Sequence, residues 1–133
     1  MKEIIEVLNA NPMGVLATVD NGKPQVRPWG FMLEEDDKLW FCTANTKPVF
    51  QQMKKNPSVA FCTTTPEYVT VRLSGDAHFS KDMAMKKKII EHCEIVRSNY
   101  KTPDNPIFEI FYLEHGTASL SDFSGKPPKT VSF

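Results

Sequence analysis

Apolar positions alternate with polar ones along much of the chain, in short runs separated by turn residues. Between residues 68 and 79, Val69, Val71 and Leu73 alternate with polar neighbours, which is typical of a strand with one buried face. Asn21-Gly22 favours a tight hairpin turn, because both residues accept positive φ angles. The pattern predicts six strands, over residues 13–19, 24–33, 38–43, 58–64, 68–79 and 107–120, the last interrupted near His115-Gly116.

Helical spacing predicts three helices, over residues 2–10, 47–55 and 81–97. In the second helix, Val49, Phe50 and Met53 fall on one face, which we expect to pack against the sheet. Thr46 and Ser80 are the predicted N-caps of the second and third helices, because a hydroxyl there accepts a bond from a free backbone N–H.

Six strands in mostly hairpin order, with few helices between them, favour a mainly β fold: a small antiparallel barrel with flanking helices. We expect the first three strands to form a meander and Gly75 to mark a bulge where the sheet curls. We expect one domain over residues 1–133, with the tail 121–133 extended over the surface or over a partner.

Charge and composition argue against several classes of function. The 16 Lys and Arg residues balance 16 Asp and Glu residues, so no basic excess points to nucleic acid. No apolar run approaches the ~18 residues of a membrane span, and the first residues do not read as a secretory signal. The three cysteines and three histidines are dispersed without metal-site spacing, which fits a cytoplasmic protein with reduced thiols and no metal.

The segment from Thr43 to Lys47 is the strongest candidate for a binding site. It joins a predicted strand to the second predicted helix, so hydroxyls, an amide and a lysine gather at a helix N-terminus. Free backbone N–H groups and the positive end of the helix dipole favour an anion there. Lys47 adds a point charge suited to a phosphate, although a lysine at a helix start is also read as a simply solvated residue.

Arg27 is the only arginine in the first half of the chain and lies on the second predicted strand. If that strand pairs with the one leading into Thr43, Arg27 and Lys47 converge on one dianion from two sides. Gly30 would expose backbone to a flat ligand, and Thr43 could bond a hydroxylated chain. Phosphate, polyol and flat ring together describe flavin mononucleotide (FMN). The alternative is a surface ion pair between Arg27 and an acid such as Glu34.

With these motifs in place, the sequence resembles the flavin-binding split barrels of the pyridoxamine 5′-phosphate oxidase superfamily. The resemblance covers nearly the whole chain and depends on the order and spacing of several motifs, none of them diagnostic alone. The matching segments are Gly14–Val19, Gly22–Pro28, Phe41-Cys42-Thr43, Thr46-Lys47, the run to Asn56-Pro57, Val71–Ala77 and Ala118–Gly125, the last of which resembles the end of the short bacterial members.

The resemblance implies a six-stranded split barrel, an FMN cofactor and a set of FMN-binding residues. That set is Arg27, Pro28, Trp29, Gly30, Phe31, Cys42, Thr43, Thr46 and Lys47. The two cations and Thr46 would hold the phosphate, residues 28–31 would lie along the isoalloxazine ring, and Cys42 and Thr43 would contact the ring edge or the ribityl chain. Trp29 is equally a candidate for a core or dimer contact. The family also implies a homodimer with two flavins at the interface, each site completed by the other subunit.

Two departures exclude true pyridoxamine phosphate oxidase activity. Met32 stands five residues after Arg27, where those enzymes carry a substrate-contacting lysine, and the tail 121–133 lacks their substrate-gripping arginine and histidine. No residue resembles a dedicated acid–base catalyst, which is acceptable because a flavin carries out hydride transfer itself. We expect a flavin-dependent oxidoreductase that passes electrons from a reduced nicotinamide to a small acceptor. The alternatives are a flavin-binding carrier or sensor without turnover, and the same barrel with a deazaflavin or haem.

Overall fold

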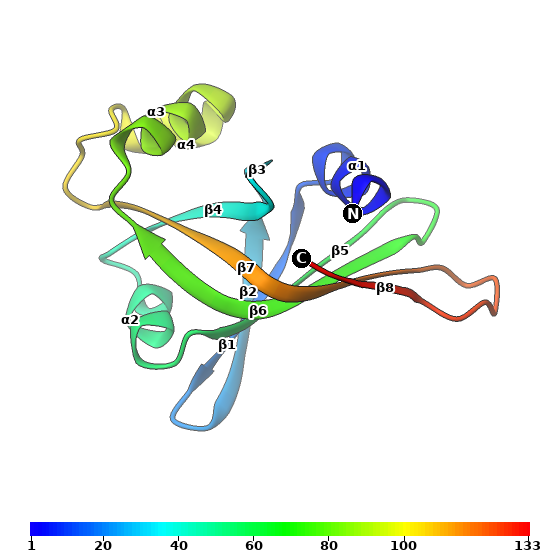
Figure 1. Cartoon of the computed structure of the whole chain (residues 1–133). Helices are drawn as coiled ribbons and strands as arrows, with labels where there is room; N and C mark the ends of the chain where they lie inside the picture. Colours follow the sequence, from blue (N-terminus) through cyan, green and yellow to red (C-terminus); the bar gives the residue numbers. More distant parts are fainter.

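The computed structural model describes residues 1–133 as eight strands and four helices (Figure 1). In chain order these are α1 (Lys2–Ala10), β1 (Met13–Asp20), β2 (Lys23–Gly30), β3 (Leu33–Glu35), β4 (Lys38–Ala44), α2 (Pro48–Lys55), β5 (Ser58–Thr64), β6 (Thr70–Ser80), α3 (Met83–His92), α4 (Glu94–Tyr100), β7 (Phe108–Ser121) and β8 (Lys129–Ser132). All strand pairs are antiparallel, and their order is β2-β1-β5-β6-β7-β4-β3, with β8 added beside β7. The fold is therefore mainly β, as predicted.

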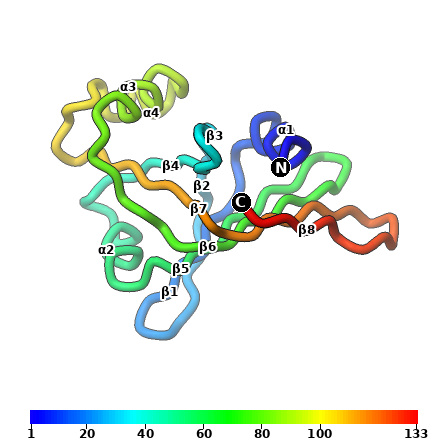
Figure 2. The backbone as a smooth tube through the Cα atoms, viewed as in Figure 1, coloured from blue at the N-terminus to red at the C-terminus, as the bar shows by residue number.

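The sheet is curled, and α1, α2 and the α3/α4 pair lie at different places around it (Figure 2). The main core is built from strand residues together with α1 and α2. Large aromatic side chains fill its centre, where the rings of Phe41 and Phe111 stack with centroids 5.4 Å apart. α1 and α2 each contribute an apolar face to this core, and Met53 of α2 is 1% exposed. A second apolar cluster lies between the α3/α4 layer and the other face of β4, where Trp40 packs with Ile89.

The predicted meander of the first three strands is wrong. β2 pairs only with β1, while β4 lies at the other end of the sheet, between β7 and β3. The chain leaves the ladder at Phe31 and Met32, because their N–H groups donate to the carbonyls of Pro12 (2.8 Å) and Trp40 (3.0 Å). That break makes β3 a separate strand, and with β8 it raises the strand count from the predicted six to eight.

Two predicted helix caps are also wrong. Lys47, not Thr46, is the N-cap residue of α2, and its side chain makes no capping bond. At α3 the cap is Asp82 instead of Ser80, since the Asp82 carboxylate accepts from the N–H groups of Ala84 (3.0 Å) and Met85 (3.3 Å). The single predicted helix over 81–97 divides at Cys93 into α3 and α4. None of the four helices is long and apolar enough to cross a membrane.

The predicted bulge at Gly75 is confirmed. The β6/β7 register shifts between Ser74 and Asp76, where Gly75 faces two residues of β7, His115 and Gly116. His115 has a φ of 56°, which turns the strand locally without ending it, so the predicted interruption is a bulge inside a continuous β7. The tail is extended as expected, because β8 pairs with β7 of its own chain.

Candidate functional site

The Arg27 side chain, on β2, connects this strand to β1 and to α2. Its Nη1 donates to the Leu16 carbonyl at 3.2 Å and to Thr18 Oγ1 at 2.9 Å, while Nη2 donates to Gln52 Oε1 at 2.9 Å. Thr18 also donates to Gln52 Oε1, at 2.6 Å. Trp29 lies two residues further along β2 and therefore points to the same side. The guanidinium thus ties β2 to β1 and to α2.

The positive charge of Arg27 has no carboxylate partner. Its acceptors are all neutral, and Glu34, the acid weighed as a partner from the sequence, instead accepts from the Asp37 N–H at 3.1 Å. Burial lowers the pKa of Arg27, although an arginine remains charged at neutral pH. A guanidinium has five N–H groups and three are used here, so two remain to bind an anion.

Lys47 supplies a second unpaired cation at the start of α2. Its side chain is exposed, it takes part in no ion pair, and its Nζ lies 5.4 Å from the centroid of the Trp29 ring. Gln52, which holds Arg27, follows Lys47 by five residues, or about one and a half helical turns. Both cations are therefore brought to α2, with Trp29 beside them. From the sequence, we expected the two cations to be close because β2 was predicted to pair with β4, and the structure does not contain that pairing.

Two of the predicted site residues carry buried polar atoms without a hydrogen-bond partner. Trp29 Nε1, Thr43 Oγ1 and Trp40 Nε1 are the three such side-chain atoms in the chain. Thr43 is 1% exposed and lies on the side of β4 that faces the main core with Phe41, whereas Trp40 belongs to the second cluster. An unpaired buried polar group costs about 1–3 kcal/mol. Trp29 and Thr43 therefore suit a polar ligand beside Lys47.

Cys42 points to the opposite side of β4 from Thr43. It packs against the second cluster, and burial, with a smaller effect of Cys93, raises the pKa of its thiol to about 12. The thiol is therefore protonated at neutral pH and is not a nucleophile. A ligand that contacts the Thr43 side chain can therefore contact only backbone atoms of Cys42.

The segment from Pro28 to Phe31 offers backbone more than side chains. Pro28 is exposed, and the Phe31 ring is buried in the main core, with its centroid 5.7 Å from that of Phe41. A Cβ on Gly30 would lie 3.2 Å from Met32 Cε and 3.3 Å from Met13 Sδ. Thr46 is exposed next to Lys47. The backbone of this segment, rather than its side chains, is therefore what it can offer to a ligand, and contact with a flat ring stays a prediction.

Sequence reasoning missed Thr18 and Gln52, the neutral partners of Arg27. Gln52 follows Val49 by three residues, so helical spacing alone places it near the apolar face of α2. Thr18 is a buried threonine on a strand with an apolar inner face, and its 2% exposure was not visible in the pattern.

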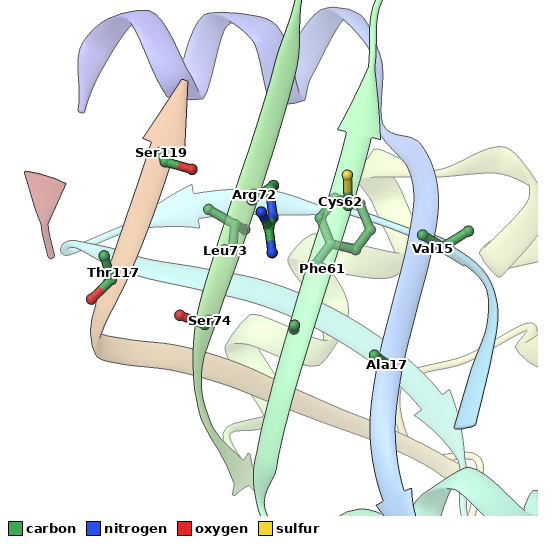
Figure 3. Close-up of a pocket in the computed structure, with 10 residues that line it drawn as sticks. Val15, Ala17, Phe61, Cys62, Arg72, Leu73, Ser74, Thr117 and Ser119 are labelled. Carbon is green, nitrogen blue, oxygen red and sulfur yellow. The ribbon is translucent and has the colours of Figure 1, made fainter. Parts of the chain in front are cut away.

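The outer face of the sheet carries a shallow hollow of about 230 Å³ (Figure 3). Two rows of cross-strand neighbours form it: Val15, Cys62, Arg72 and Ser119 in one, and Ala17, Ala60, Ser74 and Thr117 in the other. Small side chains in the second row leave space beside the long Arg72. Arg72 is exposed there and has no acidic partner.

Solved structures with this fold carry several functions. A NimC/NimA family protein from Clostridium acetobutylicum has a TM-score of 0.89 and 29% identity, covering 100% of this chain and 92% of its own. A pyridoxamine 5′-phosphate oxidase-related, FMN-binding protein from Nostoc punctiforme has a TM-score of 0.74 and 19% identity, with coverages of 97% and 87%. A haem-binding protein from Mycobacterium smegmatis has a TM-score of 0.80 and 15% identity, with coverages of 98% and 56%.

No curated protein matches the sequence. The sequence profile of the family described as pyridoxamine 5′-phosphate oxidase, in contrast, matches residues 1–114. This span includes the Arg27 network, Trp29, Thr43 and Lys47, and it ends within β7. The chain belongs to the pyridoxamine 5′-phosphate oxidase family.

Proposed function

We propose that the protein binds FMN and uses it to transfer electrons from a reduced nicotinamide to a small acceptor. The observation that carries this proposal is the pair of cations at α2, Arg27 and Lys47, which have no carboxylate partners. Lys47 lies beside the Trp29 ring and follows Thr43 by four residues, and the buried polar atoms of Trp29 and Thr43 have no partner. When bound, FMN would supply hydride or electron transfer, and the protein would supply binding and orientation.

The residues divide into roles by their chemistry. Lys47 and the two free N–H groups of Arg27 would hold the phosphate, with Thr46 beside them. Trp29 Nε1 and Thr43 Oγ1 would bond polar atoms of the flavin, and the backbone of residues 28–31 would lie along its ring. Cys42 would contribute backbone only. Met32, which is 8% exposed, replaces the substrate-contacting lysine of pyridoxamine phosphate oxidases, so the acceptor is proposed to be a different molecule.

Flavin binding is tested by titrating FMN into flavin-free protein and following flavin fluorescence. Lys47→Ala should raise the Kd for FMN roughly tenfold, because it removes one charge-assisted hydrogen bond to the phosphate. The matched control is Lys55→Ala, an exposed lysine in the last turn of the same helix, which should leave the Kd unchanged. Purified protein that is colourless and takes up no added FMN would refute the proposal. An absorption spectrum also distinguishes a flavin from a deazaflavin or haem.

Turnover separates the oxidoreductase from a flavin-binding carrier or sensor. We expect the FMN-loaded protein to oxidise a reduced nicotinamide nucleotide over many turnovers when a quinone or nitro compound is present. Stoichiometric flavin reduction with no further turnover would favour the carrier or sensor. The three free cysteines fit the proposed cytoplasmic location, where thiols stay reduced.

We also propose a homodimer in which a second copy covers the outer face of the sheet and completes the flavin sites. Val15 is 41% exposed and Val26 67% exposed, although both are large apolar side chains on neighbouring strands. The row of small residues through Ala60 offers a surface that another copy can approach closely. Exposed apolar residues grouped in this way favour an interface.

A further inference from the structure

A hollow of about 670 Å³ lies where three parts of the chain meet, away from α2. Its walls come from the α1–β1 connection, from the break between β2 and β3, and from the junction of α3 with α4. Its volume falls within the ~300–1,000 Å³ of typical small-molecule sites. Of the predicted FMN-binding residues, only Gly30 and Phe31 line it.

The floor of the hollow is apolar and in part unusually exposed. Phe31 and Met32 are buried beneath it, whereas Met13 is 67% exposed and Ile95 70% exposed. Gly30 lets the two methionines come together, since its missing Cβ would lie 3.2 Å from Met32 Cε and 3.3 Å from Met13 Sδ. Flexible thioethers adapt to varied apolar ligands. Large apolar side chains left exposed around a hollow indicate a binding surface.

The rim of the hollow is acidic. Glu34 and Glu94 line it, and neither forms an ion pair, while no lysine or arginine is among the lining residues. The helix ends at the junction add no net charge to this, because the negative C-terminal end of α3 is bonded by Arg97 and the positive N-terminal end of α4 begins beside it at Glu94. The two carboxylates therefore give the hollow its preference for a cation over an anion.

We propose that this hollow binds a small organic cation, an apolar body that carries one ammonium group. The body would lie on the methionine and isoleucine side chains, and the ammonium would face Glu34 and Glu94. The hollow lacks Arg27, Lys47, Trp29 and Thr43, but it shares Gly30 and Phe31 with the segment proposed to lie along the flavin ring, so the two ligands would adjoin there. The proposed ligand is a cation, whereas the phosphorylated substrates of pyridoxamine phosphate oxidases carry an anionic group.

The test uses three ligands of one shape and different charge: 2-naphthylmethylammonium, 2-naphthylmethanol and 2-naphthoate. Calorimetric titration of the full chain at low salt should give the tightest binding for the ammonium and the weakest for the carboxylate, with roughly a tenfold spread. Methyl NMR should show the ammonium shifting the signals of Met13, Met32 and Ile95. Equal affinity for all three ligands, or shifts confined to another surface, would overturn the proposal.

Substitutions of the two rim glutamates test whether their charges cause the preference for the ammonium ligand. Glu94→Gln and Glu34→Gln should each weaken the ammonium roughly threefold and leave the alcohol unchanged, because only the charge is removed. Glu91→Gln, an exposed change on α3 outside the hollow, is the control and should have no effect. Repeating the titration with saturating FMN distinguishes this site from the flavin site. Retained ammonium binding supports the proposal, whereas its displacement by FMN means that the flavin fills the hollow and the proposal is wrong.

Discussion

Arg27 combines a structural and a proposed binding role through different N–H groups. Three of its N–H groups connect β2 to Leu16, Thr18 and Gln52, so the side chain is held before any ligand arrives. Because every partner is neutral, the charge remains available to a phosphate. A residue fixed in this way loses little conformational freedom on binding, which favours affinity.

Arg27→Lys should therefore affect both stability and FMN binding, although it preserves the charge. A lysine cannot reproduce the planar fork, so we expect the free energy of unfolding to fall by about 1–3 kcal/mol. FMN affinity should fall as well, since Gln52 and α2 lose their tie to β2. Denaturant unfolding measures the first effect and fluorescence titration the second. Arg97→Lys on α4 is the control for FMN affinity, because Arg97 bonds only carbonyls of α3, and an equal loss of affinity in the two variants would contradict this assignment.

Cys42 should make stability depend on pH in the alkaline range. Burial raises the pKa of its thiol from 9.0 to about 12, so the folded protein holds this proton more tightly than the unfolded chain. The resulting stability is fully present below about pH 9 and is lost as pH rises through about pH 12, at up to about 1.4 kcal/mol per pH unit. Unfolding free energies measured at about pH 8 and about pH 10.5 should differ less in Cys42→Ala than in the wild type. An unchanged difference would contradict the prediction, and Cys62→Ala is the control.

At the scale of elements, alternation and helical spacing predicted the helices, strands and turns that depend on neighbouring residues in the sequence. The helix over residues 2–10 and the strand over 58–64 have the predicted bounds, and the bulge at Gly75 is where the glycine indicated. The break at Phe31 and Met32 was not predictable, because their N–H groups bond outside the β1–β2 ladder, to Pro12 before β1 and to Trp40 on β4. A continuous apolar run across 31–33 cannot show that its hydrogen bonds leave the strand.

The candidate site shows the same division between local and distant information. The residue types at Arg27 and Lys47 were informative, since unpaired cations and a helix start suggest an anion site. Their proximity was derived from a pairing of β2 with β4 that does not exist, and it results from the packing of α2 instead. The opposite orientations of Cys42 and Thr43 did follow from strand alternation, which the assignment of both to one ligand overlooked.

At the bulge between β6 and β7, a side chain should be tolerated at Gly75 on β6 and should be destabilising at Gly116 on β7. A Cβ on Gly116 would lie 2.4 Å from the Ser74 carbonyl oxygen, whereas one on Gly75 would lie 3.5 Å from its nearest neighbour, Gly116 Cα. We therefore expect Gly116→Ala to cost about 1–3 kcal/mol of unfolding free energy, because the carbonyl it meets is held in the ladder. Gly75→Ala, the matched control, should cost less than about 1 kcal/mol. Thermal or denaturant unfolding measures both, and similar costs would show that the bulge is not closely packed.

At the scale of the whole molecule, the proposed sites centre on different elements but share strands β1 and β2. The Arg27 and Lys47 region lies at α2, the acidic hollow lies at the α3/α4 junction, and the outer face of the sheet carries the rows through Arg72 and Ala60. Met13 of the acidic hollow lies on β1 and points to the same side as Val15 and Ala17, so a second copy on the outer face would approach one edge of the hollow. Binding of the small cation should therefore be compared in the wild type and in a monomeric variant.

Ala60→Lys should separate the proposed dimer into monomers. Ala60 lies exposed on β5, between Ala17 and Ser74 of the neighbouring strands, so a long charged side chain there would fill the hollow and hold a second copy away. Light scattering after size exclusion should give about twice the 15.1 kDa chain mass for the wild type and the single-chain mass for the variant. Asn99→Lys, which adds the same side chain to the exposed side of α4, should remain dimeric. If the partner completes each flavin site, Ala60→Lys should also lose FMN although Arg27 and Lys47 are unchanged. A monomeric wild type at micromolar concentration would refute the dimer, and a monomeric variant that keeps its FMN would show that one chain forms the site alone.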